Sequence, residues 1–270
     1  MKIAYSNLAC PEWSMEEVFT HAAEVGFDGV EIRLLDGNVI PHTIDAVVRE
    51  RIVKLARDSG VEIIGIGAST RFATPDTSER ERNVDELLRY IELAARMEVP
   101  MVRTFGGGFK VGAADEREAV QFVAEGLTKV AQRAKELGVS VLLETHDEFS
   151  HSAMVRDVLL QVNSREIGAL WDAHHPYRMG EGVEETYRNL APSLQHVHLK
   201  DARRKGDDWE LVVFGEGEVP VQDVVQKLSD AGYDRYLCVE WERKWHPEIE
   251  QAKTALPKHM TILKEYLARA

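Results

Sequence analysis

The chain has 270 residues, of which 33 are basic and 46 acidic, so its formal net charge is −13. This acidity opposes binding to a phosphate backbone, and the longest basic run, residues 203–205, is followed at once by Asp207 and Asp208. The composition therefore argues against a nucleic-acid partner. The length fits either two small domains or one (β/α)8 barrel, for which about 250 residues are typical.

The two cysteines, Cys10 and Cys238, are too few for a disulfide framework. No apolar stretch approaches the roughly 18 residues that a membrane span needs. The first residues, MKIAYSN, are typical of a strand and not of a signal peptide. We therefore expect a cytoplasmic protein without a membrane partner.

Strand-like and helix-like runs alternate along the whole chain. Eight runs rich in β-branched and aromatic residues predict strands at residues 2–7, 29–33, 61–68, 101–107, 139–146, 167–175, 196–201 and 236–242. The first run between them, residues 14–26, predicts a helix that begins with a capping box of Ser14 and Glu17 and stops at Gly26. Later helices are expected to stop similarly, at Gly60, Gly138 and Gly232.

The repeat itself indicates the architecture. Eight β-then-α units without a linker or a change of composition favour an α/β fold with a single closed (β/α)8 TIM barrel, one domain over residues 1–270. No GxGxxG follows the first strand, so a dinucleotide site has little support. The glycine-rich segment 105–109 fits a flexible loop and a close backbone approach to a ligand equally well.

Four predicted strands in the second half carry, toward their carboxyl ends, a residue that can hold a metal: Glu144, Asp172, His198 and Glu240. They lie 28, 26 and 42 residues apart, and a βαβ unit takes about 30 residues. Each interval therefore leads from one strand through a helix to the next strand. The third interval, of 42 residues, includes a longer loop. The sequence predicts that three carboxylates and an imidazole meet at one rim of the barrel.

Strand alternation extends this prediction into layers. We expect the layer directly above the four candidate ligands, nearer the barrel mouth, to contain His146, His174, Lys200 and Glu242. We expect the layer directly below them to contain Leu142, Leu170, His196 and Cys238. Three converging carboxylates would repel one another without a cation, so we predict one divalent metal. The oxygen-rich ligand set favours Mn²⁺ first, then Mg²⁺ or Co²⁺, and the single imidazole keeps Zn²⁺ possible.

These segments resemble the xylose isomerase-like TIM barrels, in particular the sugar (phosphate) isomerase/epimerase family of ketose 3-epimerases, hydroxypyruvate isomerases and inosose dehydratases. The resemblance spans the chain and is most specific in GFDGVEIR at 26–33, LLETH, WDAHH, HVHLKD and VEWE. It implies that Glu144, Asp172, His198 and Glu240 bind one divalent metal and that Glu144 and Glu240 also serve as acid and base. It further implies a homodimer or homotetramer.

The chemistry of such a metal leads to the same roles. A ketose bound through its carbonyl and a neighbouring hydroxyl has an acidified α-proton, because the metal stabilises the enediolate. Two glutamates on opposite faces would epimerise the carbon, one carboxylate on one face would interconvert aldose and ketose, and loss of a β-hydroxyl would be dehydration. We therefore predict a metal-dependent sugar isomerase or epimerase, with a dehydratase of an inosose or keto-sugar as the alternative.

Three residues near the ligands are predicted to contact substrate. His175 resembles the family histidine that touches substrate near the metal, and its alternative is a histidine hydrogen-bonded beside Pro176. His146 and Lys200 lie one layer above the ligands, where either could polarise a substrate oxygen. Lys200 could instead pair with Glu242 or Asp201.

Three further substrate residues are predicted at the rim. Arg204 falls where ketose 3-epimerases have a substrate-binding arginine, although its ArgArgLys run fits a solvated loop as well. Glu31 could anchor a hydroxyl or orient a basic neighbour. Trp13, on a loop that follows a strand, could form an apolar wall against a sugar.

Two other classes of function are disfavoured. Abasic-site endonucleases of the same superfamily need a three-metal cluster, and the strand ends at 65–69 and 103–107 supply no extra histidine. A non-catalytic sugar or metal binder would not need two carboxylates beside the metal. No convincing phosphate cradle is present, so the expected substrate is a neutral polyol, ketose or keto-acid.

Overall fold

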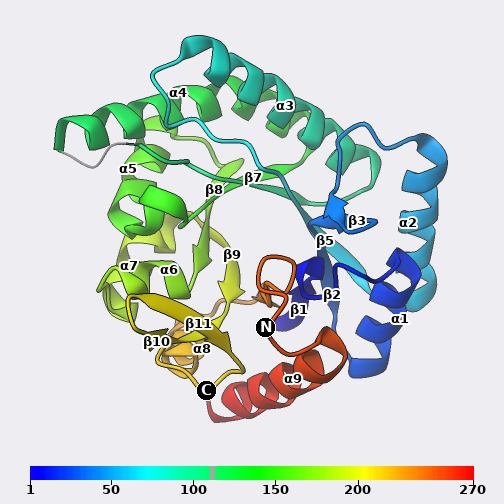
Figure 1. Cartoon of the computed structure of the whole chain (residues 1–270). Coiled ribbons are helices and arrows are strands. Elements are labelled where there is room, and N and C mark those ends of the chain that lie inside the picture. Colours follow the sequence, from blue (N-terminus) through cyan, green and yellow to red (C-terminus); the bar gives the residue numbers. More distant parts are fainter. Residues whose placement is uncertain (110–112) are drawn as a thin grey trace. The chain divides into compact units, whose positions relative to one another are not determined.

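The structure is a computed structural model that describes residues 1–109 and 113–270. Eight parallel strands form a closed barrel in the order β1-β12-β9-β8-β7-β6-β5-β2 (Figure 1). The barrel strands are β1 (Lys2–Ser6), β2 (Gly29–Ile32), β5 (Glu62–Gly67), β6 (Met101–Thr104), β7 (Ser140–Glu144), β8 (Ile167–Asp172), β9 (Leu194–Leu199) and β12 (Tyr236–Val239). Each corresponds to one predicted strand, so the predicted (β/α)8 TIM barrel is confirmed.

Helices connect the barrel strands. They are α1 (Met15–Val25), α2 (Ala46–Ser59), α3 (Thr77–Arg96), α4 (Ala113–Leu137), α5 (Ser152–Val162), α6 (His174–Arg178), α7 (Val183–Leu190), α8 (Val221–Asp230) and α9 (Ala252–Arg269), with short 3₁₀ turns η1 (Asn7–Ala9), η2 (Asp147–Ser150) and η3 (Ala191–Ser193). No helix in the described part of the chain is long and apolar enough to cross a membrane.

The predicted helix boundaries hold well. Both hydrogen bonds of the capping box between Ser14 and Glu17 are present, and α1 ends at Gly26, whose φ of 90° suits glycine. Gly60 ends α2 in the same left-handed conformation. Gly138 directly follows α4, and Gly232 lies two residues after α8.

The chain divides into two compact units. The first joins residues 1–64 to residues 197–270, and in it β1 pairs with both β2 and β12. Helices α1 and α2 pack together, as do α8 and α9. The second unit comprises residues 65–196, where β7 pairs with β6 and β8. There α4 packs against both α3 and α5 (Figure 1).

Two antiparallel hairpins were not predicted. They are β3–β4 (Leu34–Leu35 with Asn38–Val39) and β10–β11 (Asp201–Lys205 with Asp208–Val212). The predicted strand 196–201 therefore ends too late, because β9 stops at Leu199 and the chain turns into the hairpin.

The physical reason for this turn is the buried side chain of Asp201. Its carboxylate accepts backbone N–H groups from Ala202, Gly215, Gly217 and Val219 at 2.8–3.1 Å, which holds the hairpin against the segment that follows it. Burial raises the pKa of this carboxyl above its ordinary value, although all four hydrogen bonds oppose the shift.

Glycines 106 and 107 follow β6 in the segment that sequence reasoning assigned to a flexible loop or to ligand approach. A Cβ on Gly106 would lie 2.3 Å from the ring of Phe149. The carbonyl of Gly106 accepts hydrogen bonds from the backbone of Phe72 and Ala73, each at 2.9 Å. Packing against an aromatic ring therefore accounts for Gly106.

Candidate active site at the strand ends

Glu144 and Asp172 are the last residues of β7 and β8, and both side chains are buried. The Nε of Arg103, a buried residue of the neighbouring strand β6, lies 3.3 Å from Oε2 of Glu144. The same guanidinium donates to the carbonyl of Ala68 at 3.2 Å and lies 4.0 Å from the ring centroid of Phe105. Arg103 thus supplies a permanent positive charge to one of the two predicted catalytic glutamates.

Arg103 was missed by sequence reasoning. A signal was nevertheless present, because a charged residue in the middle of the apolar strand MVRT has to face either the helices or the barrel interior. However, the sequence does not give the register between β6 and β7, so it does not identify Glu144 as the partner of Arg103.

Asp172 is held by the start of the short helix α6. Its Oδ1 accepts the backbone N–H groups of His174 at 2.8 Å and His175 at 3.3 Å. Its backbone N–H donates to the hydroxyl of Thr145 at 2.9 Å. The other carboxylate oxygen, Oδ2, lies 3.9 Å from Nε2 of His175. The carboxylate is therefore fixed in orientation by the backbone that follows it.

The two predicted substrate histidines of this unit pack edge-on against each other. The rings of His146 and His175 have centroids 4.4 Å apart, and the ring of Phe105 lies 4.5 Å from that of His146. Nδ1 of His146 lies 2.9 Å from Oδ1 of Asp147. Burial disfavours the charge of Asp147, but the hydrogen bond from His146 and the nearby charges of Arg71 and Arg103 hold its pKa below the ordinary value.

His198, on β9, lies between two carboxylates of the first unit. Its Nε2 lies 2.9 Å from Oε2 of Glu31, on β2, and its Nδ1 lies 3.3 Å from Oε1 of Glu240, which directly follows β12. Neither His198 nor Glu31 has any solvent exposure. Both ring nitrogens therefore face acidic oxygens in the buried interior.

Lys200 connects the second predicted catalytic glutamate to the next acidic residue. Its Nζ lies 2.5 Å from Oε2 of Glu240 and also forms an ion pair with Glu242. Lys200 is buried, and Glu242 is partly exposed. Glu240, like Glu144, thus has a cationic partner, and this one directly follows β9, the strand that pairs with β12.

The other two predicted substrate residues lie outside these ion pairs. Arg204 is an exposed residue of β10, with its guanidinium 5.4 Å from the ring centroid of Trp209 and its backbone N–H donating to Glu218 at 2.7 Å. Trp13, just before α1, packs edge-on against His21 with ring centroids 4.8 Å apart. Within the described residues, neither joins the ion-pair clusters of Glu144 or Glu240.

Two groups of side chains among the described residues could hold a metal ion, and all their members are buried. They consist of Glu31, His196, His198 and Cys238, and of Glu144, Asp172, His198 and Glu240. The second group is identical to the ligand set expected from the sequence. Its three carboxylates and one imidazole are donors that suit a hard or borderline divalent ion.

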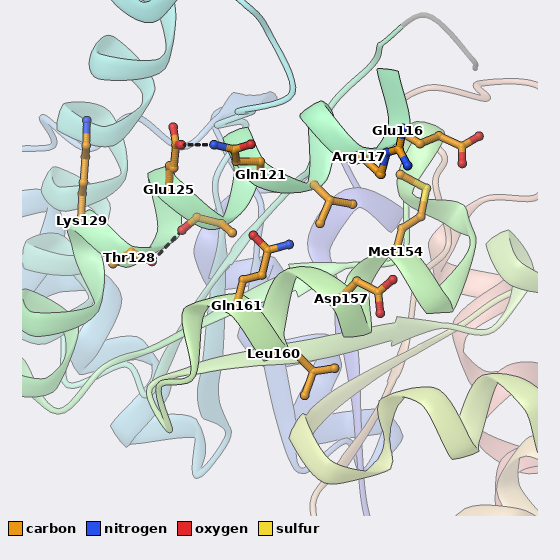
Figure 2. A pocket seen from close by; sticks show the side chains of 12 residues that line it. Glu116, Arg117, Gln121, Glu125, Thr128, Lys129, Met154, Asp157, Leu160 and Gln161 are labelled. Carbon is orange, nitrogen blue, oxygen red and sulfur yellow. Dashed lines mark hydrogen bonds between the residues drawn. The ribbon is translucent and has the colours of Figure 1, made fainter. Parts of the chain in front are cut away.

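A separate groove of about 970 Å³ lies on the outside of the second unit, between α4 and α5. Figure 2 shows its mixed lining, with Arg117, Glu125 and Lys129 from α4 and Met154 and Leu160 from α5. Its lining residues belong to the helices, whereas the ion pairs described above lie at strand ends. The groove is therefore distinct from the candidate active site.

Comparison with known proteins agrees with the fold. The pattern of the xylose isomerase-like TIM barrel family matches residues 19–266, so the chain belongs to that family. The fructoselysine 3-epimerase of Shigella flexneri is 24% identical over 268 residues, which cover 93% of this chain and 94% of that protein. The inosose dehydratase of Clostridium perfringens (strain 13 / Type A) is 24% identical over 277 residues, covering 89% and 88%.

Among solved structures, the IOLI protein with a bound zinc atom superposes with a TM-score of 0.82. The match covers 100% of this chain and 99% of that one at 16% identity, so it supports the fold. The relatives are epimerases and dehydratases, which supports an enzyme. At 24% identity they do not separate an isomerase from a lyase.

Proposed function

We propose that this protein is a divalent-metal-dependent epimerase or isomerase of a small sugar or related hydroxyketone. Glu144, Asp172, His198 and Glu240 are the proposed ligands of the metal. The observation that carries the proposal is the group that these four buried side chains form at or next to the carboxyl ends of β7, β8, β9 and β12. TIM-barrel enzymes build their active sites at this end of the strands.

The charges of the buried side chains fit a divalent cation. Four buried carboxylates, Glu31, Glu144, Asp172 and Glu240, are accompanied by three buried cations, Arg33, Arg103 and Lys200. These carboxylates outnumber the cations, and one divalent ion would offset the excess of negative charge. An uncompensated charge in a barrel interior would be costly. Mn²⁺ is the preferred ion, and the zinc atom of the IOLI structure supports Zn²⁺ as an alternative.

The protein's own groups supply the proton chemistry. A bound divalent ion would polarise the substrate carbonyl and so acidify the neighbouring C–H. Glu144 and Glu240 are the proposed acid and base, one removing the proton from that carbon and the other returning a proton to the opposite face. Arg103 and Lys200 hold these two carboxylates in place. The net result is inversion at one carbon.

His146 and His175 are the proposed contacts to substrate oxygens. Their rings pack edge-on, and His175 lies beside Asp172, with its Nε2 3.9 Å from Oδ2 of that proposed ligand. His146 is 26% exposed, so its ring is open to a molecule that arrives from solvent. A hydroxyl of a sugar or polyol is the group that two such imidazoles would bind.

Dehydration is the second candidate function, and the inosose dehydratase relative favours it. The reaction would begin with the same proton abstraction. A hydroxyl on the next carbon would then leave as water, whereas in epimerisation a proton returns to the deprotonated carbon. The proposed residues are the same for both reactions. Which one occurs is decided by the substrate and by whether a group protonates its leaving hydroxyl.

Deuterium incorporation tests the proposal. The protein is stripped with a chelator, loaded with Mn²⁺, and incubated in D₂O with a panel of ketoses, inososes and small keto-acids, and NMR follows C–H exchange and product. We expect exchange that requires the metal and falls by at least about 10²-fold in Glu144→Gln and Glu240→Gln. Glu181→Gln, a buried carboxylate that hydrogen-bonds Ser152 and Thr186, is the matched control and should retain exchange. A protein that binds no metal, or exchange that persists without metal, would refute the proposal.

A further inference from the structure

We propose that Glu31 is a positioning residue that fixes which nitrogen of His198 faces the metal. Glu31 is not one of the four proposed ligands, and its carboxylate touches one of them. The inference rests on the proposed metal site, because it concerns how that site is preorganised before the ion binds.

The geometry around the imidazole is asymmetric. Nε2 of His198 lies 2.9 Å from Oε2 of Glu31, which is the usual length of a hydrogen bond. Nδ1 lies 3.3 Å from Oε1 of Glu240, a proposed ligand of the same metal. One ring nitrogen therefore faces the proposed ligand set, and the other faces Glu31.

A neutral imidazole carries only one N–H, so its two nitrogens cannot play the same role. A carboxylate only accepts hydrogen bonds, and Glu31 therefore keeps the proton of His198 on Nε2. The lone pair then lies on Nδ1, on the side of Glu240, where a metal ligand is needed. Pairs of this kind orient ligand histidines in metalloproteins and raise the basicity of the coordinating nitrogen.

The strand order and register of the barrel place Glu31 where it can orient His198. Strand β2 is separated from β9 by β1 and β12, so Glu31 does not reach His198 as the neighbour on an adjacent strand. It reaches the imidazole across the interior of the first unit. The ladder between β1 and β2, which pairs Ser6 with Glu31, fixes the height from which the carboxylate extends.

A rival role for Glu31 is direct ligation of an ion. Glu31, His196, His198 and Cys238 form the other group that could hold a metal, and it contains a thiol. The 2.9 Å separation between Glu31 and His198 indicates a direct hydrogen bond instead. An ion in this group would be bound to sulfur, which gives a spectroscopic signature that the proposed oxygen and nitrogen ligands lack.

The test measures metal binding without reference to catalysis. Chelator competition gives the Zn²⁺ dissociation constant of the wild type, Glu31→Gln, Glu31→Asp and the control Glu181→Gln. We expect Glu31→Gln to weaken binding about 10- to 100-fold, since Gln accepts or donates and leaves both tautomers available. Glu31→Asp, which keeps the carboxylate, should recover part of the loss, and Glu181→Gln should match the wild type.

Two spectra complete the test. In the Zn²⁺-loaded wild type, ¹⁵N NMR should show the Nε2 of His198 protonated and its Nδ1 bound to metal, and Glu31→Gln should lose this single pattern. In the Co²⁺ form we expect no thiolate-to-cobalt absorption band.

Each contrary result has a distinct meaning. Equal Zn²⁺ affinity and an unchanged His198 pattern in Glu31→Gln would overturn the positioning role while leaving the proposed function intact. A thiolate band that disappears in Cys238→Ser would also overturn it, by placing the ion in the group that contains Glu31. A wild type that binds no metal would remove the proposed function and this inference together.

Discussion

The substitution Arg103→Met breaks the buried ion pair with Glu144 while keeping most of the volume of the arginine stem. Both partners are almost fully buried, with side-chain exposures of 2% and 1%. Removing one member of such a pair leaves an uncompensated charge in the interior, which costs about 3–5 kcal/mol. The substitution also leaves the carbonyl of Ala68 without its 3.2 Å hydrogen bond, worth about 1 kcal/mol. Because these contributions share one side chain and are not additive, we expect a loss of about 4 kcal/mol in the free energy of unfolding.

The assay is urea unfolding of the metal-free protein and of the protein with Mn²⁺. The matched control is Arg133→Met, since Arg133 forms ion pairs with Glu92 at 3.1 Å and Glu136 at 3.3 Å but is 42% exposed. Exposed pairs contribute about 0–1 kcal/mol, so the control should barely change the midpoint. With Mn²⁺ the penalty of Arg103→Met should shrink, because a bound cation would compensate Glu144. Equal effects of the two substitutions in the metal-free protein would refute the reasoning.

Three further predictions concern stability. Burial lowers the pKa of His259 to about 3, against about 6.5 in the unfolded chain, so the unfolded state binds more protons between these values and stability falls as the pH drops below 6.5. His259→Phe should therefore lessen the loss of stability between pH 6 and pH 4.5 by about 2 kcal/mol, as measured by urea unfolding at each pH. Gly126→Ala in α4 should destabilise by about 1–3 kcal/mol despite the better helix former, because the new Cβ would lie 2.5 Å from the ring of Phe72, and an unchanged Tm would contradict this. Ser14→Ala removes the N-cap of α1 and should cost about 1 kcal/mol in thermal unfolding, with Glu17→Gln, which keeps a capping-box side chain, as the milder comparison.

The fold could be predicted because each repeat carries its own local signals. A strand such as Ile167–Asp172 is apolar throughout, as expected for a parallel strand covered on both faces. In a helix such as α1, local sequence marks both ends: the capping box marks the start and Gly26 marks the end. The β10–β11 hairpin was missed because β10, DARRK, is mostly charged, and because the hairpin's position depends on hydrogen bonds that Asp201 accepts from residues up to 18 positions away.

The grouping of the proposed ligands could be predicted for a related reason. Parallel barrel strands deliver their carboxyl ends to one rim, so the last inward residue of each strand can be read from the strand alone. Glu144 and Asp172 lie near the carboxyl ends of the predicted strands, and in the structure they are the last residues of β7 and β8. Their identity as ligands nevertheless remains a proposal until metal binding is measured.

The partners of these side chains were harder to predict, because a partner is defined by register and not by local sequence. Arg103 pairs in the β6–β7 ladder with Leu142, two residues before Glu144, so its guanidinium has to extend along the barrel axis to reach the carboxylate. Lys200 extends from the end of β9 to Glu240 at the end of β12.

Glu31 is the extreme case, since it reaches His198 from a strand three positions around the barrel. The distinction has a functional consequence. Arg103 reaches Glu144 from the adjacent strand, whereas the contact of Glu31 with His198 depends on the positions of several strands. Substitutions at Glu31 should therefore disturb metal affinity more than their small change in volume suggests.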